Sequence, residues 1–267
     1  MSVQQKPSAI PEELDGFRVE IDAENKRGDI VLDRPPMNVI SMEQRDQLRR
    51  AFEALDVDDR IRVIVLRAQG DNFSSGGYIS GFLEATPEHV SHLADNIAAP
   101  WRVSKPVIAG NQGYTFGVGF EISLACDFRI ATQSCQYSLP EQKLGQIPGS
   151  GGSARLQAII GIARTKDVVM RSRRISGQLA YDWGIATEVV EDGELEAATA
   201  KLVEELCGFS PLAQRTAKKL INDSENATVA TGIELEGHAY SRLRQSEDFA
   251  EGVLAFHEKR EALFKGV

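Results

Sequence analysis

The chain has 267 residues, a net charge of -9 at neutral pH, 42% hydrophobic residues and 26% charged residues. This length allows one large domain or two with a sizeable core, and the acidic balance argues against non-specific nucleic-acid binding, which needs lysine and arginine to displace phosphate counterions. The cysteines, Cys126, Cys135 and Cys207, form no C-x-x-C pair, so we expect reduced thiols in a cytoplasmic protein.

The N-terminal part of the chain predicts a leader, a hairpin and a helix. Residues 1–14 are polar and are expected to form a loose leader; neither a signal peptide nor a membrane span is predicted. Apolar and polar residues alternate over residues 17–21, as on a half-buried strand. A turn at residues 25–28 leads to a second predicted strand at 29–33, so we expect a β-hairpin. Ser41 and Gln44 form a capping-box pattern ahead of apolar residues at helical spacing.

The middle of the chain repeats one order of elements. Strands are predicted at residues 63–66, 106–109 and 128–131, and glycine-rich loops lead into helices near 120–125 and from 153. Either stacked strand–strand–helix turns or a doubly wound sheet satisfies this order. From Ser210-Pro211, a cap followed by proline, the chain is predicted to be almost wholly helical.

Several common kinds of site are absent from the sequence. There is no H-E-x-x-H zinc motif, no G-x-S-x-G nucleophile elbow and no phosphate-binding P-loop motif. His89 and His92 are three residues apart, but nothing near them completes a metal site, and His238 and His257 lie in other helix-like segments. We therefore expect no metal centre.

Three glycine-rich turns remain as candidates, at residues 73–78, 113–119 and 149–152. Glycine permits close approach to the main chain, and two such loops facing each other make an oxyanion hole; any one alone is more simply a tight turn. Glu121 follows the second loop within an apolar run, so burial is expected to raise its pKa and suit it to acid–base catalysis, although a carboxylate there also compensates a helix dipole. Glu141 precedes the third loop and, taken alone, is typical of a surface acid.

These segments resemble, in order, the motifs of the crotonase (enoyl-CoA hydratase/isomerase) family over nearly the whole chain. The family's first loop, F-x-A-G-[AG]-D-[LI], corresponds to residues 73–79, and N-G-x-x-x-G-[GA]-G-x-E-L-x-x-x-C-D corresponds to residues 111–127. The third motif, F-x-x-P-E-x-x-x-G-x-x-P-G-x-G-G, corresponds to residues 137–152, and residues 251–260 resemble the family's closing helix.

The resemblance implies an α/β fold, a crotonase-type superhelix of stacked ββα turns with a C-terminal helical trimerisation region. Residues 1–209 would form the spiral core that carries the active site, and residues 210–267 a helical subdomain for oligomerisation and for capping coenzyme A. It also implies an acyl-CoA substrate, no cofactor beyond the coenzyme A moiety of that substrate, and a homo-oligomer, either a trimer or a hexamer built as a dimer of trimers. No nucleic-acid or membrane partner is expected.

The site residues follow from the matched motif positions. Glu121 and Glu141 match the two catalytic carboxylates of the hydratases, and the backbone N–H groups of Gly77 and Val118 match the oxyanion hole that holds the thioester carbonyl. Gly149 matches a backbone donor beside the catalytic water. The adenine pocket corresponds to Met37, Ser75 and Ile79. Lys259 matches a cation that binds the 3′-phosphate of the coenzyme on a neighbouring subunit.

Departures from the family pattern bear on the substrate. Tyr78 replaces the usual aspartate, Gln112 replaces a glycine, and Pro36-Met37 shortens a loop that usually carries a lysine. Tyr78, Phe82 and Leu83 are expected to form an apolar wall around a short acyl group, and by overall appearance the chain is similar to the methylthioacryloyl-CoA hydratases of the family.

Two glutamates favour a hydratase, because water addition needs one group to accept a proton and another to donate one. An acyl-CoA thioester hydrolase or an enoyl-CoA isomerase on the same scaffold stays open. So does a non-catalytic or RNA-associated family member, although the glutamate pair and the acidic charge weigh against it.

Overall fold

The computed structural model describes residues 10, 13–86 and 90–267, so most of the expected leader, and His89, lie outside the described residues. The chain begins with the predicted hairpin, whose strands β1 (Phe17–Asp22) and β2 (Arg27–Leu32) pair antiparallel. Helix α1 (Met42–Asp56) follows, and both hydrogen bonds of the predicted Ser41–Gln44 capping box are present. The hairpin and the capped helix are therefore confirmed.

A six-stranded sheet forms the first layer of the core. After β2 it continues with the parallel strands β3 (Val63–Ala68), β4 (Val107–Asn111), β6 (Phe128–Thr132) and β9 (Glu188–Val190), in the order β1-β2-β3-β4-β6-β9. Alternate residues of β3 face opposite sides, as the pleat requires. Ile64 and Leu66 pack in the cluster that includes α1, whereas Val63 and Val65 pack against α8 (Leu195–Cys207). Both faces of the sheet are thus covered by helices.

A second, smaller sheet lies beyond the carboxyl ends of these strands. It consists of β5 (Tyr114–Phe116), β7 (Gln136–Ser138) and β8 (Ile175–Ser176), in the order β5-β7-β8. The sequence predicted a loop where β5 lies and did not predict β7 or β8. These strands are only two or three residues long, so their pairing partners rather than their own periodicity define them. After β3, each turn of the chain contributes one strand to each sheet, in the pairs β4 and β5, β6 and β7, and β8 and β9. This arrangement decides for stacked ββα turns over a doubly wound sheet.

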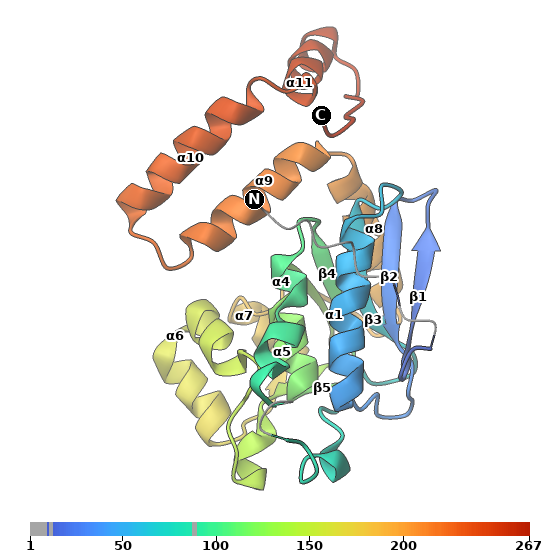
Figure 1. Cartoon of the computed structure of the whole chain (residues 1–267), viewed down its shortest axis with the longest axis vertical. Helices are drawn as coiled ribbons and strands as arrows, with labels where there is room; N and C mark the ends of the chain where they lie inside the picture. The colour runs from blue at the N-terminus through green and yellow to red at the C-terminus, as the bar shows by residue number, and fades with distance from the viewer. Residues whose placement is uncertain (1–9, 11–12, 87–89) are drawn as a thin grey trace.

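Helices and short helical turns complete the core. They follow the strands of the second sheet or connect the turns (Figure 1). In chain order they are η1 (Ile79–Gly81), α3 (Leu93–Ile97), α4 (Ala99–Arg102), α5 (Val118–Leu124), η2 (Pro140–Leu144), α6 (Gly152–Met170) and α7 (Gly177–Asp182).

The C-terminal region is helical, as predicted. It contains α9 (Pro211–Ser224), α10 (Val229–Leu243) and α11 (Glu247–Glu258), and Ser210 caps α9 ahead of Pro211. Figure 1 shows α9 and α10 running side by side at one end of the molecule, with α11 beyond them. The division into units at residue 210 stays a prediction. Among the described residues, no helix combines the length and apolarity that a membrane span requires.

Lys218 anchors α9 to the core. Its buried ammonium group donates hydrogen bonds to the carbonyl oxygens of Pro100 and Lys105, at 2.7 and 2.9 Å, and to Asp127 Oδ2 at 2.8 Å. Burying a charge is costly unless it is paired and hydrogen-bonded. This cation therefore specifies where the helical region begins relative to β4 and β6.

Candidate active site

The first two glycine-rich loops are brought into direct contact. A Cβ atom added at Gly117 would lie 3.6 Å from the Cα of Gly76, and one added at Gly76 would lie 3.4 Å from the carbonyl oxygen of Phe116. Ser74 joins the loops through a bridge to Thr115 and accepts a 2.9 Å hydrogen bond from the Phe116 N–H. Gly76 and Gly117 both have positive φ, so glycine is needed there for conformation as well as for space.

The two predicted oxyanion-hole donors flank this contact. Ile40 and Gly77 form a parallel β-bridge, but its hydrogen bonds are made by the residues on either side of Gly77. The Ile40 N–H donates to the Gly76 carbonyl oxygen, and the Tyr78 N–H donates to the Ile40 carbonyl oxygen. Gly77's own N–H consequently has no backbone acceptor within the described residues. Val118 begins α5, so its N–H has no intrahelical partner. Two free donors on adjoining loops are what an oxyanion site requires.

Glu121 lies in the first turn of α5 and is only 3% exposed. Its Oε1 accepts backbone hydrogen bonds from Ser150 at 2.7 Å and Gly152 at 3.1 Å, in the third glycine-rich loop. Burial raises the pKa of this carboxyl, and the two N–H donors act in the opposite direction. The structure thus confirms the predicted burial and shows that the third loop holds the carboxylate.

Glu141 is in a different electrostatic environment. It lies in η2 and is half-buried, and its buried Oε2 has no hydrogen-bond partner among the described residues. Burial, and to a smaller extent the nearby charge of Glu121, raise the pKa of Glu141 to about 7. A Cβ atom at Gly117 would lie 3.1 Å from Glu141 Oε1, which places this carboxyl against the loop that carries Val118.

The two carboxyl groups therefore differ in what stabilises their charge. Glu121 has two donors that favour its ionised form, whereas Glu141 has an unpartnered oxygen that favours its protonated form. Two titratable groups whose environments differ in this way can act as base and acid on the same molecule. This is the chemistry that the arrangement permits.

The predicted water-positioning residue, Gly149, is exposed and precedes the two residues whose N–H groups bind Glu121. Among the predicted coenzyme contacts, the Ser75 N–H donates to Met37 O at 2.8 Å, and Ile79 begins η1 with an exposed side chain. Met37 and Ser75 are therefore in direct contact, and Ile79 follows four residues after Ser75. The functions assigned to these four residues stay predictions.

The predicted acyl-pocket residues surround η1. Phe82 approaches Gly77 so closely that a Cβ atom there would lie 2.6 Å from Phe82 Cζ. Tyr78 is half exposed and Leu83 almost fully exposed. Lys259 is the C-cap of α11, and Figure 1 shows this helix at one end of the molecule, beyond α9 and α10 and away from α5 and β5.

Sequence reasoning missed Arg45, which lies beside this site. The residue is 4% exposed, and its Nη2 is 3.1 Å from the position that a Cβ of Gly77 would occupy. The signal was available, because Arg45 precedes Leu48 and Phe52 on the apolar side of α1, where an arginine is unusual.

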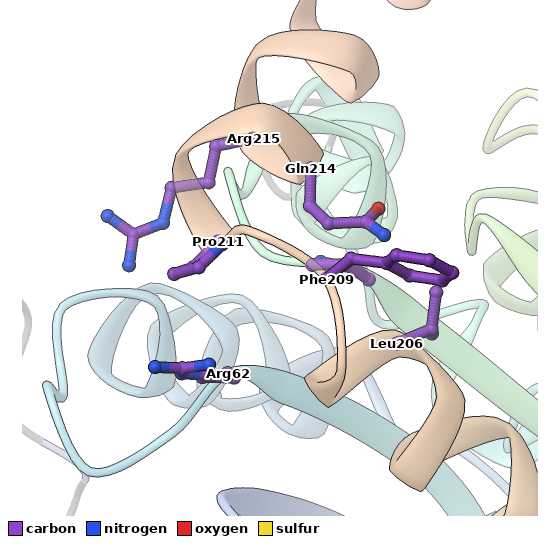
Figure 2. A pocket seen from close by; sticks show the side chains of 7 residues that line it. Arg62, Leu206, Phe209, Pro211, Gln214 and Arg215 are labelled. Carbon is purple, nitrogen blue, oxygen red and sulfur yellow. The ribbon is translucent and has the colours of Figure 1, made fainter. Parts of the chain in front are cut away.

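A separate pocket lies where α8 meets α9. Figure 2 shows Phe209 and Gln214 on one side of it and Arg62 and Arg215 on the other. Neither glutamate belongs to its lining, so it is distinct from the site described above.

Comparisons with known proteins find relatives over nearly the whole chain. The family model described as enoyl-CoA hydratase/isomerase matches residues 23–267. A carnitinyl-CoA dehydratase from Salmonella arizonae is 34% identical over 249 residues, which is 89% of this chain and 94% of that protein. A crystal structure of an enoyl-CoA hydratase from Bacillus anthracis superimposes with a TM-score of 0.89 at 32% identity, covering 95% of this chain and all of that one. A crystal structure of an enoyl-CoA hydratase subunit I from Geobacillus kaustophilus gives a TM-score of 0.90 at 31% identity, covering 96% of this chain and all of that one.

Proposed function

This chain belongs to the enoyl-CoA hydratase/isomerase (crotonase) family, and we propose that it is a hydratase that adds water across the α,β double bond of a short enoyl-CoA thioester. The observation that carries the proposal is the pair of carboxyl groups, Glu121 and Glu141, held in unlike environments beside two free backbone donors. Family membership supports a CoA-thioester enzyme of the lyase type, and the unlike carboxyls support the two-glutamate reaction.

In the proposed reaction, ionised Glu121 accepts a proton from water as the oxygen attacks the β carbon. The electrons of the double bond move toward the thioester, and the enolate oxygen is held by the N–H groups of Gly77 and Val118. Protonated Glu141 then donates its proton to the α carbon. One water is consumed, and proton exchange between the carboxyls and solvent restores both groups.

The reverse of this reaction is a dehydration, so the same groups serve either direction. Carnitinyl-CoA dehydratases at 34% identity are named for such a step. The resemblance to methylthioacryloyl-CoA hydratases makes methylthioacryloyl-CoA the first specific substrate to test. Water addition at its sulfur-bearing carbon gives a hemithioacetal that can release methanethiol, and thioester hydrolysis would then free CoA. This route would place the enzyme in sulfur metabolism, in dimethylsulfoniopropionate breakdown.

Assembly is part of the proposal. The described C-terminal helices expose apolar side chains of α10 and α11, among them Val229, Ile233 and Phe256, which favours burial against other copies. A trimer or a hexamer would also allow Lys259 of one subunit to approach the coenzyme bound to another, as the family pattern implies. We further propose that the enzyme is cytoplasmic and uses no cofactor beyond the coenzyme A moiety of its substrate.

Mass spectrometry of products formed in oxygen-18 water tests the reaction. Crotonyl-CoA and methylthioacryloyl-CoA are incubated with wild type, Glu121→Gln and Glu141→Gln, and we expect labelled 3-hydroxyacyl-CoA, or methanethiol and free CoA, from wild type alone. Each variant should lose 10²- to 10⁴-fold in rate, the range of general acid–base catalysis. Label found only in a released carboxylic acid would indicate a hydrolase, a shifted double bond an isomerase, and no turnover a non-catalytic protein. Salt-dependent RNA binding distinguishes the RNA-associated alternative.

A further inference from the structure

Arg45 is a buried cation for which the described part of the chain offers no hydrogen-bond acceptor. The residue is 4% exposed, its Nε is buried and unpartnered, and no hydrogen bond from its guanidinium is found within the described residues. A guanidinium carries five N–H donors, and burial without acceptors is costly enough to lower the pKa of Arg45. Such a group in the core requires an explanation.

Its neighbours on the same helix show the contrast. Arg49, one turn further along α1, donates to Asp46 at 2.7 Å and to both carboxylate oxygens of Glu53 at 2.8 Å. Arg50 is exposed and pairs with Asp46 at 2.8 Å. Arg49 and Arg50 are therefore satisfied by acidic partners, whereas Arg45 has none at hydrogen-bond distance among the residues that the structure describes.

The position of Arg45 relative to the site is specific. Its Nη2 lies 3.1 Å from the Cβ position of Gly77, and its guanidinium carbon is 6.0 Å from the centre of the Phe82 ring. The charge of Glu121 acts on it through space, but the donors that reach Glu121 Oε1 are the backbone N–H groups of Ser150 and Gly152. The guanidinium thus lies beside both the oxyanion donor Gly77 and Phe82, a predicted wall of the acyl pocket, and within the described residues it donates no hydrogen bond.

We propose that Arg45 determines substrate specificity by binding an acceptor oxygen, and best of all a carboxylate, on the acyl group of the substrate. This inference rests on the proposed function, because it takes the Gly77 N–H as the group that holds the thioester oxygen. With the thioester oxygen held there, a guanidinium whose Nη2 is 3.1 Å from the Gly77 Cβ position would be within reach of acyl carbons a few bonds beyond the carbonyl. Guanidinium matches carboxylate in both charge and fork geometry.

The charge of Arg45 also predicts how strongly other acyl groups bind. A quaternary ammonium such as that of a carnitinyl group would be repelled, which separates this chain from the dehydratases that it resembles. A methylthio group would gain little binding free energy from Arg45, because a thioether sulfur is a weak hydrogen-bond acceptor. A plain alkyl group leaves the guanidinium unsatisfied. The expected order of preference is therefore carboxylated, then neutral, then cationic acyl groups.

Calorimetric titration of the full-length protein with glutaryl-CoA and butyryl-CoA tests binding without turnover. We expect wild type to bind glutaryl-CoA about tenfold more tightly than butyryl-CoA, the effect of one charge-assisted hydrogen bond. Arg45→Met should abolish this preference, and the matched control Arg50→Met, on the exposed side of α1, should retain it. A wild-type preference for butyryl-CoA, or an unchanged ratio in Arg45→Met, overturns the proposal.

Kinetics give a second measurement on wild type, which stays decisive even if Arg45→Met does not fold. The kcat/KM ratio of glutaconyl-CoA to crotonyl-CoA should exceed one, and the ratio of crotonobetainyl-CoA to crotonyl-CoA should be well below one. Ratios in the opposite order refute the proposal. If no enoyl-CoA gains water while glutaryl-CoA still binds preferentially through Arg45, the hydratase proposal fails and the assignment of Arg45 stands.

Discussion

The pH dependence of the reaction tests which glutamate acts as the acid and which as the base. Burial raises the pKa of Glu141 to about 7, and the proposed reaction uses this group in its protonated form. Activity should therefore be lost as pH rises through about 7, because the proton donor is removed. An ordinary exposed glutamate, with a pKa near 4.3, would give no such loss in this range.

The expected loss of activity follows from the pKa of Glu141. With a value of about 7, Glu141 is about nine tenths protonated at pH 6 and about one tenth protonated at pH 8. The kcat/KM for crotonyl-CoA should fall close to tenfold per pH unit above pH 7. Glu121 must be ionised to accept a proton from water, so activity should also decline on the acid side, at a pH that burial of Glu121 raises and its two N–H donors lower. The two groups interact, so both limbs report apparent values of the pair.

Stability gives an independent measurement of the same group. The pKa of Glu141 is raised on folding, so its contribution favours the folded state below the unfolded pKa and is lost as pH rises through about 7. Glu141→Gln is uncharged at every pH and should be more stable than wild type at pH 8, by about 1 to 3 kcal/mol. The lower end allows for solvent around a half-buried carboxyl. The two proteins should be equally stable near pH 4.

The assay follows the loss of the enoyl thioester absorbance from pH 5 to pH 9, and urea unfolding of wild type and Glu141→Gln supplies the stability comparison. A rate that rises through pH 7 would show that Glu141 acts in its ionised form and would exchange the roles of the two glutamates. A flat profile together with equal stability of both proteins at pH 8 would refute the raised pKa itself.

Three further substitutions test the framework around the site. Gly117→Ala adds a Cβ at φ 51° and ψ -128°, and 3.1 Å from Glu141 Oε1, so we expect a loss of about 1 to 3 kcal/mol in thermal unfolding together with reduced kcat. Lys218→Met leaves Asp127 Oδ2 without its cation and should cost about 3 to 5 kcal/mol in urea unfolding. Ser41→Ala removes the cap of α1 and should cost about 1 kcal/mol in the same assay.

Each of these has an outcome that contradicts it. Unchanged stability and kcat in Gly117→Ala would mean that the loop relaxes without disturbing Glu141. If Lys218→Met unfolds at the wild-type urea concentration, the buried ion pair does not anchor α9. The conservative variant Ser41→Thr keeps the capping hydroxyl, and a loss equal to that of Ser41→Ala would exclude capping as the cause.

Features that depend on near neighbours in the chain were predictable. The Ser41–Gln44 capping box involves residues three apart, and the hairpin strands are joined by a short turn, so local pattern is sufficient to define both. The short strands β5, β7 and β8 were not predictable, because two or three residues carry too little periodicity and their partners lie far away in the chain.

Some features of the candidate site were likewise predictable from the sequence, and others were not. Ordered motifs and the residue types of Glu121 and Glu141 were enough to indicate paired carboxylates next to glycine-rich loops. Only the tertiary structure decided that Gly76 meets Gly117, and that the charge of Glu121 is held by N–H groups 29 and 31 residues away while an oxygen of Glu141 is left without a partner. A pKa depends on burial and on donors in three dimensions, and Arg45 reaches Gly77 only through folding, so neither property is encoded in any short stretch of sequence.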